Sequence, residues 1–178
     1  MLKLLLVFIK TGMVYLNKIL GRIILYLNPE FFCLKPLYAL KGIKMRKLSG
    51  SCLCNKVKIE VPDEFEYMGN CHCSECRKFT GSDYSSVGGL SSDKFVFTSG
   101  EEVVSTYGKS EETELAFCRL CGSSLFSRKL KTGKHNIRLG ILDDTPTHKP
   151  SFHIFTGSKA PWNEISDDLK QFEKGPVK

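Results

Sequence analysis

The chain has 178 residues, 42% of them apolar and 25% charged, a composition that fits one ordinary globular domain with an extension. Its net charge of +7 lies almost wholly in residues 1–44, which hold seven basic residues and one acidic residue, whereas residues 45–178 hold 19 basic and 18 acidic residues. A domain with that balance lacks the basic surface of a nucleic-acid-binding protein, so nucleic acid is not an expected partner.

The first segment, residues 1–44, has the pattern of a basic amphipathic helix. Residues 1–27 are largely apolar and carry four basic side chains, Lys3, Lys10, Lys18 and Arg22. At about 100° per residue these four would fall within roughly 120° of one another on a helix. We therefore expect a helical extension over residues 1–44 that contacts a membrane surface. It would not span the membrane, because its uncharged stretches are far shorter than ~18 residues.

The same segment does not fit a secretory signal. Its apolar run, Leu4–Ile9, is too short, and no small-residue cleavage site follows. We therefore expect a cytoplasmic protein. The composition changes at Met45. Residues 45–50 lead directly into the cysteine-containing region and resemble the N-terminal residues of a protein. Two interpretations stay open: residues 1–44 are a genuine extension, or the start is wrongly extended. In both, residues 45–178 form the functional domain.

From Val57 onward the chain has the pattern of short strands. Alternating, β-branched or aromatic segments predict strands at residues 57–61, 95–97, 103–107, 113–117, 125–126, 136–142 and 152–155. Residues 71–76 are expected to form a metal-binding loop. Ser166–Phe172, with two aspartates near its start, predicts a short helix. Short strands at regular spacing favour a mostly β domain built of antiparallel sheets.

Seven of the eight cysteines lie in three short clusters, Cys52-x-Cys54, Cys71-x-Cys73-x-x-Cys76 and Cys118-x-x-Cys121. These spacings suit thiolates that share one metal ion and are too tight for ordinary disulfide partners. Four thiolates close a tetrahedral zinc site, whereas three leave a position open for water or substrate. The count therefore predicts two zinc ions, one structural and one reactive. The remaining Cys33 is expected to act as a small hydrophobe.

Three alternative roles for the cysteines compete with the two-zinc prediction. A secreted disulfide scaffold would show an even, dispersed set behind a signal peptide, whereas this set is odd and paired. A thioredoxin-type redox pair would need one CxxC before a helix in a βαβ pattern, which the chain lacks. A single four-cysteine zinc site with three spare thiols stays open.

The positions of the clusters indicate how they would group. Cys52 and Cys54 form an extended pair on one face of the chain, and Gly122 after Cys121 lets backbone amides turn toward the sulfurs. These two distant pairs can be tied by one metal, and the triple can serve a second by itself. Strand alternation points His72 away from its neighbours, so we expect it to support the site and not to be a fourth ligand.

Several motifs occur in a characteristic order. They are Leu48–Cys54, Cys71–Lys78, Gly81, Phe117–Gly122, Leu139–Asp144, His153-Ile154 and Ala160–Trp162. The set resembles the glutathione-dependent formaldehyde-activating enzyme family, which also includes centromere protein V. The resemblance runs from about Lys47 to Pro176, and residues 1–44 have no counterpart in it.

The resemblance implies a β-tent (Mss-four-like) zinc fold. It also implies a division of ligands, with a structural zinc on Cys52, Cys54, Cys118 and Cys121 and a catalytic zinc on Cys71, Cys73 and Cys76. The family's named activity joins glutathione and formaldehyde to give S-hydroxymethylglutathione, which is a carbon–sulfur lyase reaction in reverse. A small thiol such as glutathione and a small aldehyde are therefore the expected partners. The alternative is a non-enzymatic zinc module for protein or chromatin contact.

A few further polar and aromatic side chains are candidate helpers of the reactive site. Asp143 and Asp144 favour a turn over a proton shuttle, and Trp162 favours packing over substrate stacking. His153 could reach the site from the last strand. Arg77 and Lys78 could meet a glutathione carboxylate, although a solvated charge pair is the simpler interpretation.

Overall fold

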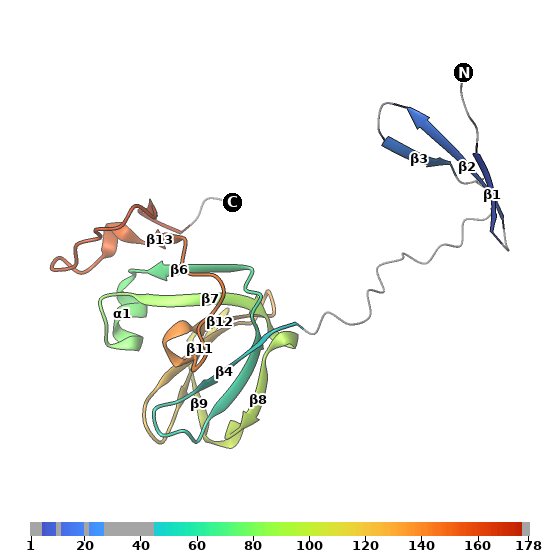
Figure 1. Ribbon diagram of the computed structural model, residues 1–178. Helices are drawn as coiled ribbons and strands as arrows, with labels where there is room; N and C mark the ends of the chain where they lie inside the picture. Colours follow the sequence, from blue (N-terminus) through green and yellow to red (C-terminus); the bar gives the residue numbers. More distant parts are fainter. Residues whose placement is uncertain (1–4, 10–11, 20–21, 27–44, 176–178) are drawn as a thin grey trace. The chain divides into compact units, whose positions relative to one another are not determined.

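The computed structural model describes residues 5–9, 12–19, 22–26 and 45–175 (Figure 1). The chain divides into two compact units, Met1–Ile43 and Lys44–Lys178. In the part of the chain that is described, no helix has the length and apolar character needed to cross a membrane.

The first unit contains strands where a helix was expected. Strands β1 (Leu5–Ile9), β2 (Gly12–Ile19) and β3 (Arg22–Tyr26) form one antiparallel sheet in that order. The helical prediction is therefore wrong over these three strands, and residues 27–44 lie outside the described part of the chain. β-branched and aromatic residues are frequent in all three strands, and two-residue gaps between paired strands suit hairpins, so β-propensity outweighs the 3.6-residue pattern. The expected membrane-surface contact, which rested on one helical face, loses its basis.

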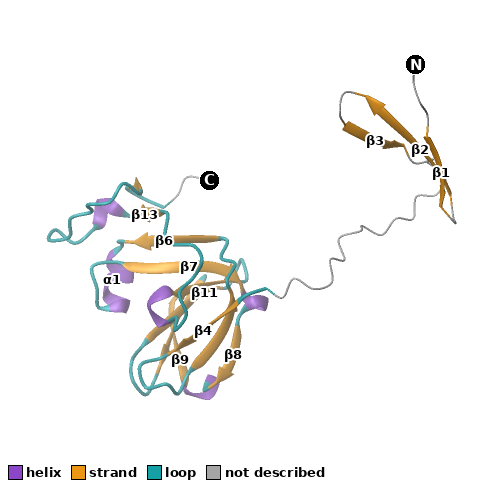
Figure 2. Cartoon of the chain, viewed as in Figure 1, coloured by secondary structure: helices purple, strands orange, loops and turns teal. Residues whose placement is uncertain are grey.

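The second unit is built mainly of short strands (Figure 2). They are β4 (Lys47–Ser51), β5 (Lys58–Pro62), β6 (Tyr67–Cys71), β7 (Ser85–Ser91), β8 (Val96–Ser99), β9 (Val104–Ser110), β10 (Thr113–Cys118), β11 (Ser124–Lys129), β12 (Lys134–Arg138), β13 (Phe152–Ile154) and β14 (Lys170–Phe172). One sheet has the order β4-β5-β8, and the other has the order β14-β13-β6-β7-β12-β11-β10-β9. Strand β13 runs parallel to β6 and β14, and the other pairs are antiparallel. The predicted mostly β, antiparallel fold is confirmed.

The hydrophobic core lies between these two sheets. Leu48 and Ile59 of the three-stranded sheet are buried in one cluster with Leu90, Phe126 and Ile137 of the eight-stranded sheet. Full burial of such a side chain contributes roughly 1.5–3 kcal/mol. Because side chains alternate along a strand, one face of the long sheet supplies this core and leaves the other face available for a site.

The predicted strands are found close to their expected positions. The structure places β5, β8, β9, β10, β11, β12 and β13 over or beside the predicted segments, with ends that differ by a few residues. Residues 139–141, expected to continue a strand, form a short 3-10 turn instead. Strands β4, β6 and β7 were not predicted, because glycine together with serine or asparagine makes these segments resemble loops.

Two predictions about helices are wrong. The segment after Cys73 forms helix α1 (Ser74–Thr80) where a loop was expected. The Cys73 sulfur accepts a hydrogen bond from the Cys76 amide as the N-cap, and Gly81 ends the helix in the left-handed region with φ 64°. Ser166–Phe172 was expected to be helical, but its end pairs with β13 as strand β14, and a seven-residue helix has little intrinsic stability against that pairing.

Candidate functional site

The first cysteine cluster joins the end of β4 to the turn after β10. The sulfurs of Cys52, Cys54, Cys118 and Cys121 lie within 4.8 Å of one another. The Cys52–Cys54 and Cys54–Cys118 sulfur pairs are 3.5 and 3.9 Å apart. A tetrahedral zinc with sulfur bonds of 2.3 Å would separate its ligands by about 3.8 Å, and a disulfide would need about 2.05 Å. The four sulfurs therefore fit a closed zinc site.

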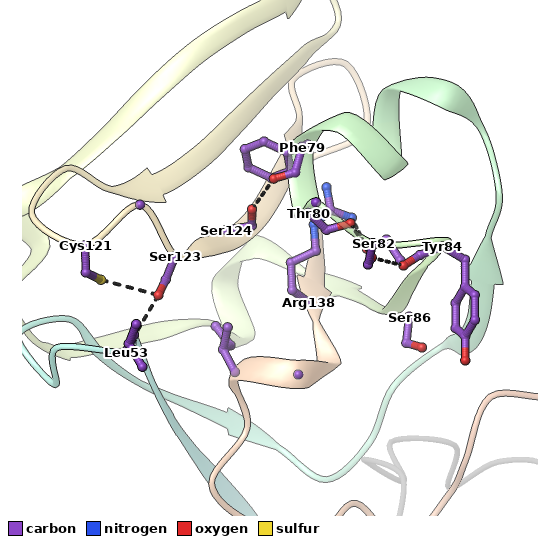
Figure 3. Close-up of a pocket in the computed structure, with 15 residues that line it drawn as sticks. Leu53, Phe79, Thr80, Ser82, Tyr84, Ser86, Cys121, Ser123, Ser124 and Arg138 are labelled. Carbon is purple, nitrogen blue, oxygen red and sulfur yellow. Dashed lines mark hydrogen bonds between the residues drawn. The ribbon is translucent and has the colours of Figure 1, made fainter. Parts of the chain in front are cut away.

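Hydrogen bonds hold the loops of this cluster. The Val57 amide donates to the Cys52 sulfur at 3.3 Å. The Ser123 hydroxyl lies 3.3 Å from the Cys121 sulfur and accepts from the Leu53 amide at 3.0 Å, so it ties the two cysteine loops together (Figure 3). The hydrogen bond from Ser123 lowers the pKa of Cys121 to about 6. Gly122, with φ 75°, makes the tight turn that this arrangement requires.

The second cluster lies where β6 meets α1. The sulfurs of Cys71, Cys73 and Cys76 lie within 4.8 Å of one another, and the Cys71 thiol donates to the Cys73 sulfur at 3.6 Å. That hydrogen bond lowers the pKa of Cys73 to about 2 and raises the pKa of Cys71. The Cys76 amide adds a further hydrogen bond of 3.3 Å to the Cys73 sulfur. Three convergent sulfurs fit a zinc ion with one position left for another ligand.

A cavity of about 580 Å³ adjoins the second cluster. All three cysteines line it, together with one face of the long sheet. The face is defined by alternate residues of neighbouring strands: Thr113 and Leu115, Ser127 and Lys129, Asn136 and Arg138. This face is opposite the one that supplies the core. One side of the long sheet is therefore packed in the hydrophobic core, and the other presents polar and charged side chains to the cavity.

Three basic side chains line this cavity: Lys109, Lys129 and Arg138. Lys109 pairs with Glu75 of α1, which also lines the cavity. In the described part of the chain, neither Lys129 nor Arg138 forms an ion pair with a carboxylate. Burial lowers the pKa of Lys129, whose ammonium donates to the Thr113 hydroxyl at 3.1 Å.

Arg138 is a buried cation beside the three cysteines. It is only 5% exposed, its guanidinium lies 5.1 Å from the Phe79 ring, and its Nη1 is 3.3 Å from the Ser85 hydroxyl. Its Nε is buried and has no hydrogen-bond partner within the described residues. Burial lowers its pKa, and the charges of Cys76 and Cys71 act in the opposite direction. Arg138 thus compensates the negative charge of the cluster.

A second cavity, of about 590 Å³, lies beside the four-cysteine cluster (Figure 3). It shares Phe79 and Arg138 with the first, and hydroxyl groups such as those of Thr80, Ser82 and Ser123 line it. Cys121 is the one clustered cysteine among its lining residues. Because its cluster is already complete with four sulfurs, this cavity has no comparable reactive group.

The basic side chains next to the cluster in sequence are not the ones that line the cavity. Arg77 donates to the Ser158 carbonyl at 3.4 Å, Lys78 is exposed, and neither lines the cavity of the three cysteines. Lys109, Lys129 and Arg138 take that place. Sequence reasoning missed them because strand register, and not sequence proximity, brings them to the cysteines.

His72 and His153 form a buried chain of hydrogen bonds behind the cluster. His72 Nε2 is 2.7 Å from His153 Nδ1, and His153 Nε2 is 3.1 Å from both oxygens of Asp167. Neither histidine lines the cavity or joins a cysteine cluster. These contacts connect the residue after β6 to β13 and to Asp167, which gives His72 a structural role.

The remaining candidates have structural contacts. Asp144 accepts from the amide and hydroxyl of Ser49 at 2.7 Å, and Asp143 accepts from the Ser51 hydroxyl at 2.9 Å, as expected of residues at a turn. Trp162 was expected to pack against other side chains, and the structure does not confirm this. It is 71% exposed, and its indole Nε1 donates to Asp83 at 2.7 Å.

The fold is mostly β and brings together one four-cysteine cluster and one three-cysteine cluster, each of which could hold a metal ion. The family model described as glutathione-dependent formaldehyde-activating enzyme matches residues 47–158, which include all seven clustered cysteines. The chain belongs to this family.

Curated relatives are similar over part of their length. An uncharacterized lyase of Schizosaccharomyces pombe is 29% identical over 82 residues, which are 46% of this chain and 58% of that protein. A Talaromyces marneffei protein with the provisional name glutathione-dependent formaldehyde-activating enzyme is 26% identical over 121 residues, 66% of this chain and 65% of its own. The chain thus spans about 58% to 65% of these relatives. A solved Rhodobacter sphaeroides structure is 23% identical with a TM-score of 0.47, covering 57% of this chain and 97% of that one.

Proposed function

We propose that the chain is a zinc-dependent carbon–sulfur lyase that joins a small thiol such as glutathione to an aldehyde, and cleaves the adduct in reverse. The observation that carries this proposal is the contrast between the clusters. Four sulfurs complete one cluster, whereas three sulfurs line a cavity large enough for a small-molecule substrate. Membership of the family and the names of its relatives support the same reaction class.

The ligand sets follow from the two clusters. Cys52, Cys54, Cys118 and Cys121 would hold a structural zinc, and Cys71, Cys73 and Cys76 would hold a catalytic one. A zinc ion held by the three thiolates would have a fourth position that favours the deprotonated form of a substrate thiol. We favour this role over activation of the carbonyl, because three thiolate ligands already donate much negative charge to the metal.

The chain's own side chains bind and orient the substrate. Lys129 and Arg138 have no carboxylate partner in the described structure, so they are suited to hold the carboxylates of an anionic thiol. Arg138 also offsets the negative charge that gathers at the cysteines. Holding thiol and aldehyde in one cavity replaces a bimolecular encounter by a reaction between neighbours.

Carbon-13 exchange spectroscopy of formaldehyde with glutathione tests the proposal, because it measures the rate at which the adduct forms and breaks. The zinc-loaded chain should accelerate the exchange, and Cys73→Ser should abolish the acceleration. Lys129→Met should weaken glutathione binding about tenfold or more, as expected for a charge-assisted hydrogen bond. The matched control, Lys131→Met, removes a lysine that is exposed and pairs with Glu112 outside the cavity, and it should leave binding unchanged.

Titration of glutathione into the cobalt-substituted chain provides a second measurement. The charge-transfer absorption should rise by the intensity of one additional sulfur ligand, and Cys73→Ser should remove that response. If neither exchange nor absorption responds to glutathione, cysteine or other small thiols, the proposal is wrong and the non-enzymatic zinc module is favoured.

A further inference from the structure

The wall of the cavity beside Cys71, Cys73 and Cys76 is strongly aromatic. Phe79, Phe152, Phe155 and Phe172 line it, and three aliphatic side chains, those of Ile154, Leu115 and Val87, line it as well. A hydroxymethyl group is small and polar and gains nothing from such a wall, because hydrophobic stabilisation grows with the apolar area that is buried. A cavity of about 580 Å³ with this lining matches a substrate that carries an apolar group.

Phe155 adds an independent observation. Its backbone has φ 58° and ψ 36°, in the left-handed region that bulky side chains rarely adopt. The conformation is held by its surroundings: the Phe155 amide donates to the Lys174 carbonyl at 3.2 Å, and its carbonyl accepts from the Ser158 amide at 3.1 Å. Strained residues of this kind occur at sites that clamp a ligand. A glycine would relieve the strain, but it would remove the ring from the cavity wall.

The basic residues of the same cavity complete an amphipathic pattern. Lys129 and Arg138 offer positive charge without an ion-pair partner in the described part of the chain. Arg138 also has a buried Nε that lacks a partner among those residues. A ligand with an anionic thiol portion and an apolar substituent would satisfy both kinds of lining.

We propose that this cavity is specific for adducts of an apolar aldehyde, with an alkyl or aryl chain of about six carbons, in preference to those of formaldehyde. Phe152, Phe155 and Phe172 hold the apolar chain, and Lys129 and Arg138 hold the carboxylates of the thiol. This proposal rests on the proposed function. In the reaction the carbon–sulfur bond forms, the carbonyl π pair moves to oxygen, and the thiol proton ends on that oxygen. The addition therefore balances without a further reactant.

Stable thioethers of glutathione test this specificity by binding alone. S-methylglutathione and S-hexylglutathione differ only in the length of the apolar chain, and calorimetry on the zinc-loaded full chain gives their dissociation constants. A fully buried methylene improves affinity by about fourfold, or about 0.8 kcal/mol. The hexyl compound should therefore bind at least about tenfold more tightly than the methyl compound.

Substitutions in the wall locate the effect. Phe155→Ala and Phe172→Ala should each reduce the preference for the hexyl compound by about threefold or more while leaving S-methylglutathione binding nearly unchanged. Tyr107→Ala is the matched control, because Tyr107 is 63% exposed and does not line the cavity. Melting temperature and zinc content show whether each variant folds, and Phe155→Leu serves if Phe155→Ala does not.

The outcomes separate the two proposals. Equal affinity for the methyl and hexyl compounds, with formaldehyde exchange still accelerated, would overturn this inference and leave the proposed function in place. If Phe155→Ala and Phe172→Ala both keep the full preference for the hexyl compound, the apolar group binds elsewhere. That result would also overturn the inference. If no thiol or thioether binds and no exchange is accelerated, the proposed function itself fails.

Discussion

At the level of single residues, the sequence predicted the thiol groups of the site and missed its charges. Spacing was sufficient for Cys71, Cys73 and Cys76, because cysteines in one short segment can share one ion. The four-cysteine cluster also needs the fold, which brings the pair at the end of β4 to the pair at the end of β10. Lys129 and Arg138 belong to different strands, and only the register of β11 and β12 in the long sheet brings them to one face. No local pattern marks such residues.

His135 shows how one buried side chain can set the pH dependence of stability. It stacks on Phe126 with ring centroids 4.7 Å apart and meets the edge of Phe95 at 5.1 Å. Burial lowers its pKa to about 4, whereas an unfolded histidine has a pKa of about 6.5. Between pH values of about 4 and about 6.5, His135 therefore binds a proton in the unfolded chain and remains neutral in the native chain.

We predict that this histidine lowers the free energy of unfolding as the pH falls from about 6.5 to about 4, by at most about 1.4 kcal/mol per pH unit. Its contribution is fully present above a pH of about 6.5. His135→Phe should remove this share of the pH dependence, because its ring can keep the aromatic contacts and His135 Nδ1 has no hydrogen-bond partner to lose among the described residues.

Urea unfolding across this pH range measures the effect. The free energy of unfolding of the variant is subtracted from that of the parent chain at each pH. The difference isolates the contribution of His135 from that of the cysteines, which also take up protons in acid. The exposed His148, replaced by Gln, is the control and should leave the curve unchanged. A parallel pH dependence in the parent chain and His135→Phe would contradict the prediction.

At the level of secondary-structure elements, the sequence predicted strands that alternate and missed β4, β6 and β7, in which glycine interrupts the pattern. Strands β6 and β7 pair with Tyr67 opposite Gly89. A Cβ at Gly89 would overlap the Tyr67 ring, so the glycine makes room for the aromatic side chain across the strand pair. A residue that usually marks a loop is here required for sheet packing, and only the pairing partner reveals it.

The two cysteine clusters differ in how far their cysteines are buried in the hydrophobic core. Cys118 ends β10, is fully buried and belongs to the hydrophobic core, whereas Cys73 and Cys76 start a short peripheral helix without buried residues. We predict that Cys118→Ser largely unfolds the second unit, since a closed zinc site contributes directly to folding. Cys73→Ser should retain the fold, lose one zinc ion and lose activity.

Thermal melts and elemental analysis of the two variants distinguish these outcomes. Cys73→Ser should melt cooperatively with one zinc per chain, and Cys118→Ser should show no cooperative transition. Equal destabilisation of both variants would mean that the second cluster is as structural as the first.

At the level of the whole molecule, the fold class was predictable because short alternating strands leave few alternatives to stacked antiparallel sheets. The arrangement of the first unit was not, because its apolar residues suited both a helical and an extended periodicity. The boundary between the two units falls between Ile43 and Lys44, beside the change in composition at Met45.

We predict that a chain starting at Met45 folds by itself, because all seven clustered cysteines and the core lie beyond that point. It should be soluble, bind two zinc ions and melt cooperatively at nearly the temperature of the full chain. Calorimetry and elemental analysis measure both properties. Aggregation of the shortened chain beside a stable full-length protein would show that the first segment contributes to the stability of the second unit.

The position of the aromatic wall near the end of the chain has a consequence for synthesis. The clustered cysteines all precede Gly122, and most of the buried core residues lie at or before Ile137, whereas Phe152, Phe155 and Phe172 follow later. A nascent chain emerges from the ribosome with its N-terminus first. The seven clustered cysteines therefore leave the ribosome before the aromatic side chains, so that their sulfurs can come together before the cavity beside Cys71, Cys73 and Cys76 gains its aromatic wall.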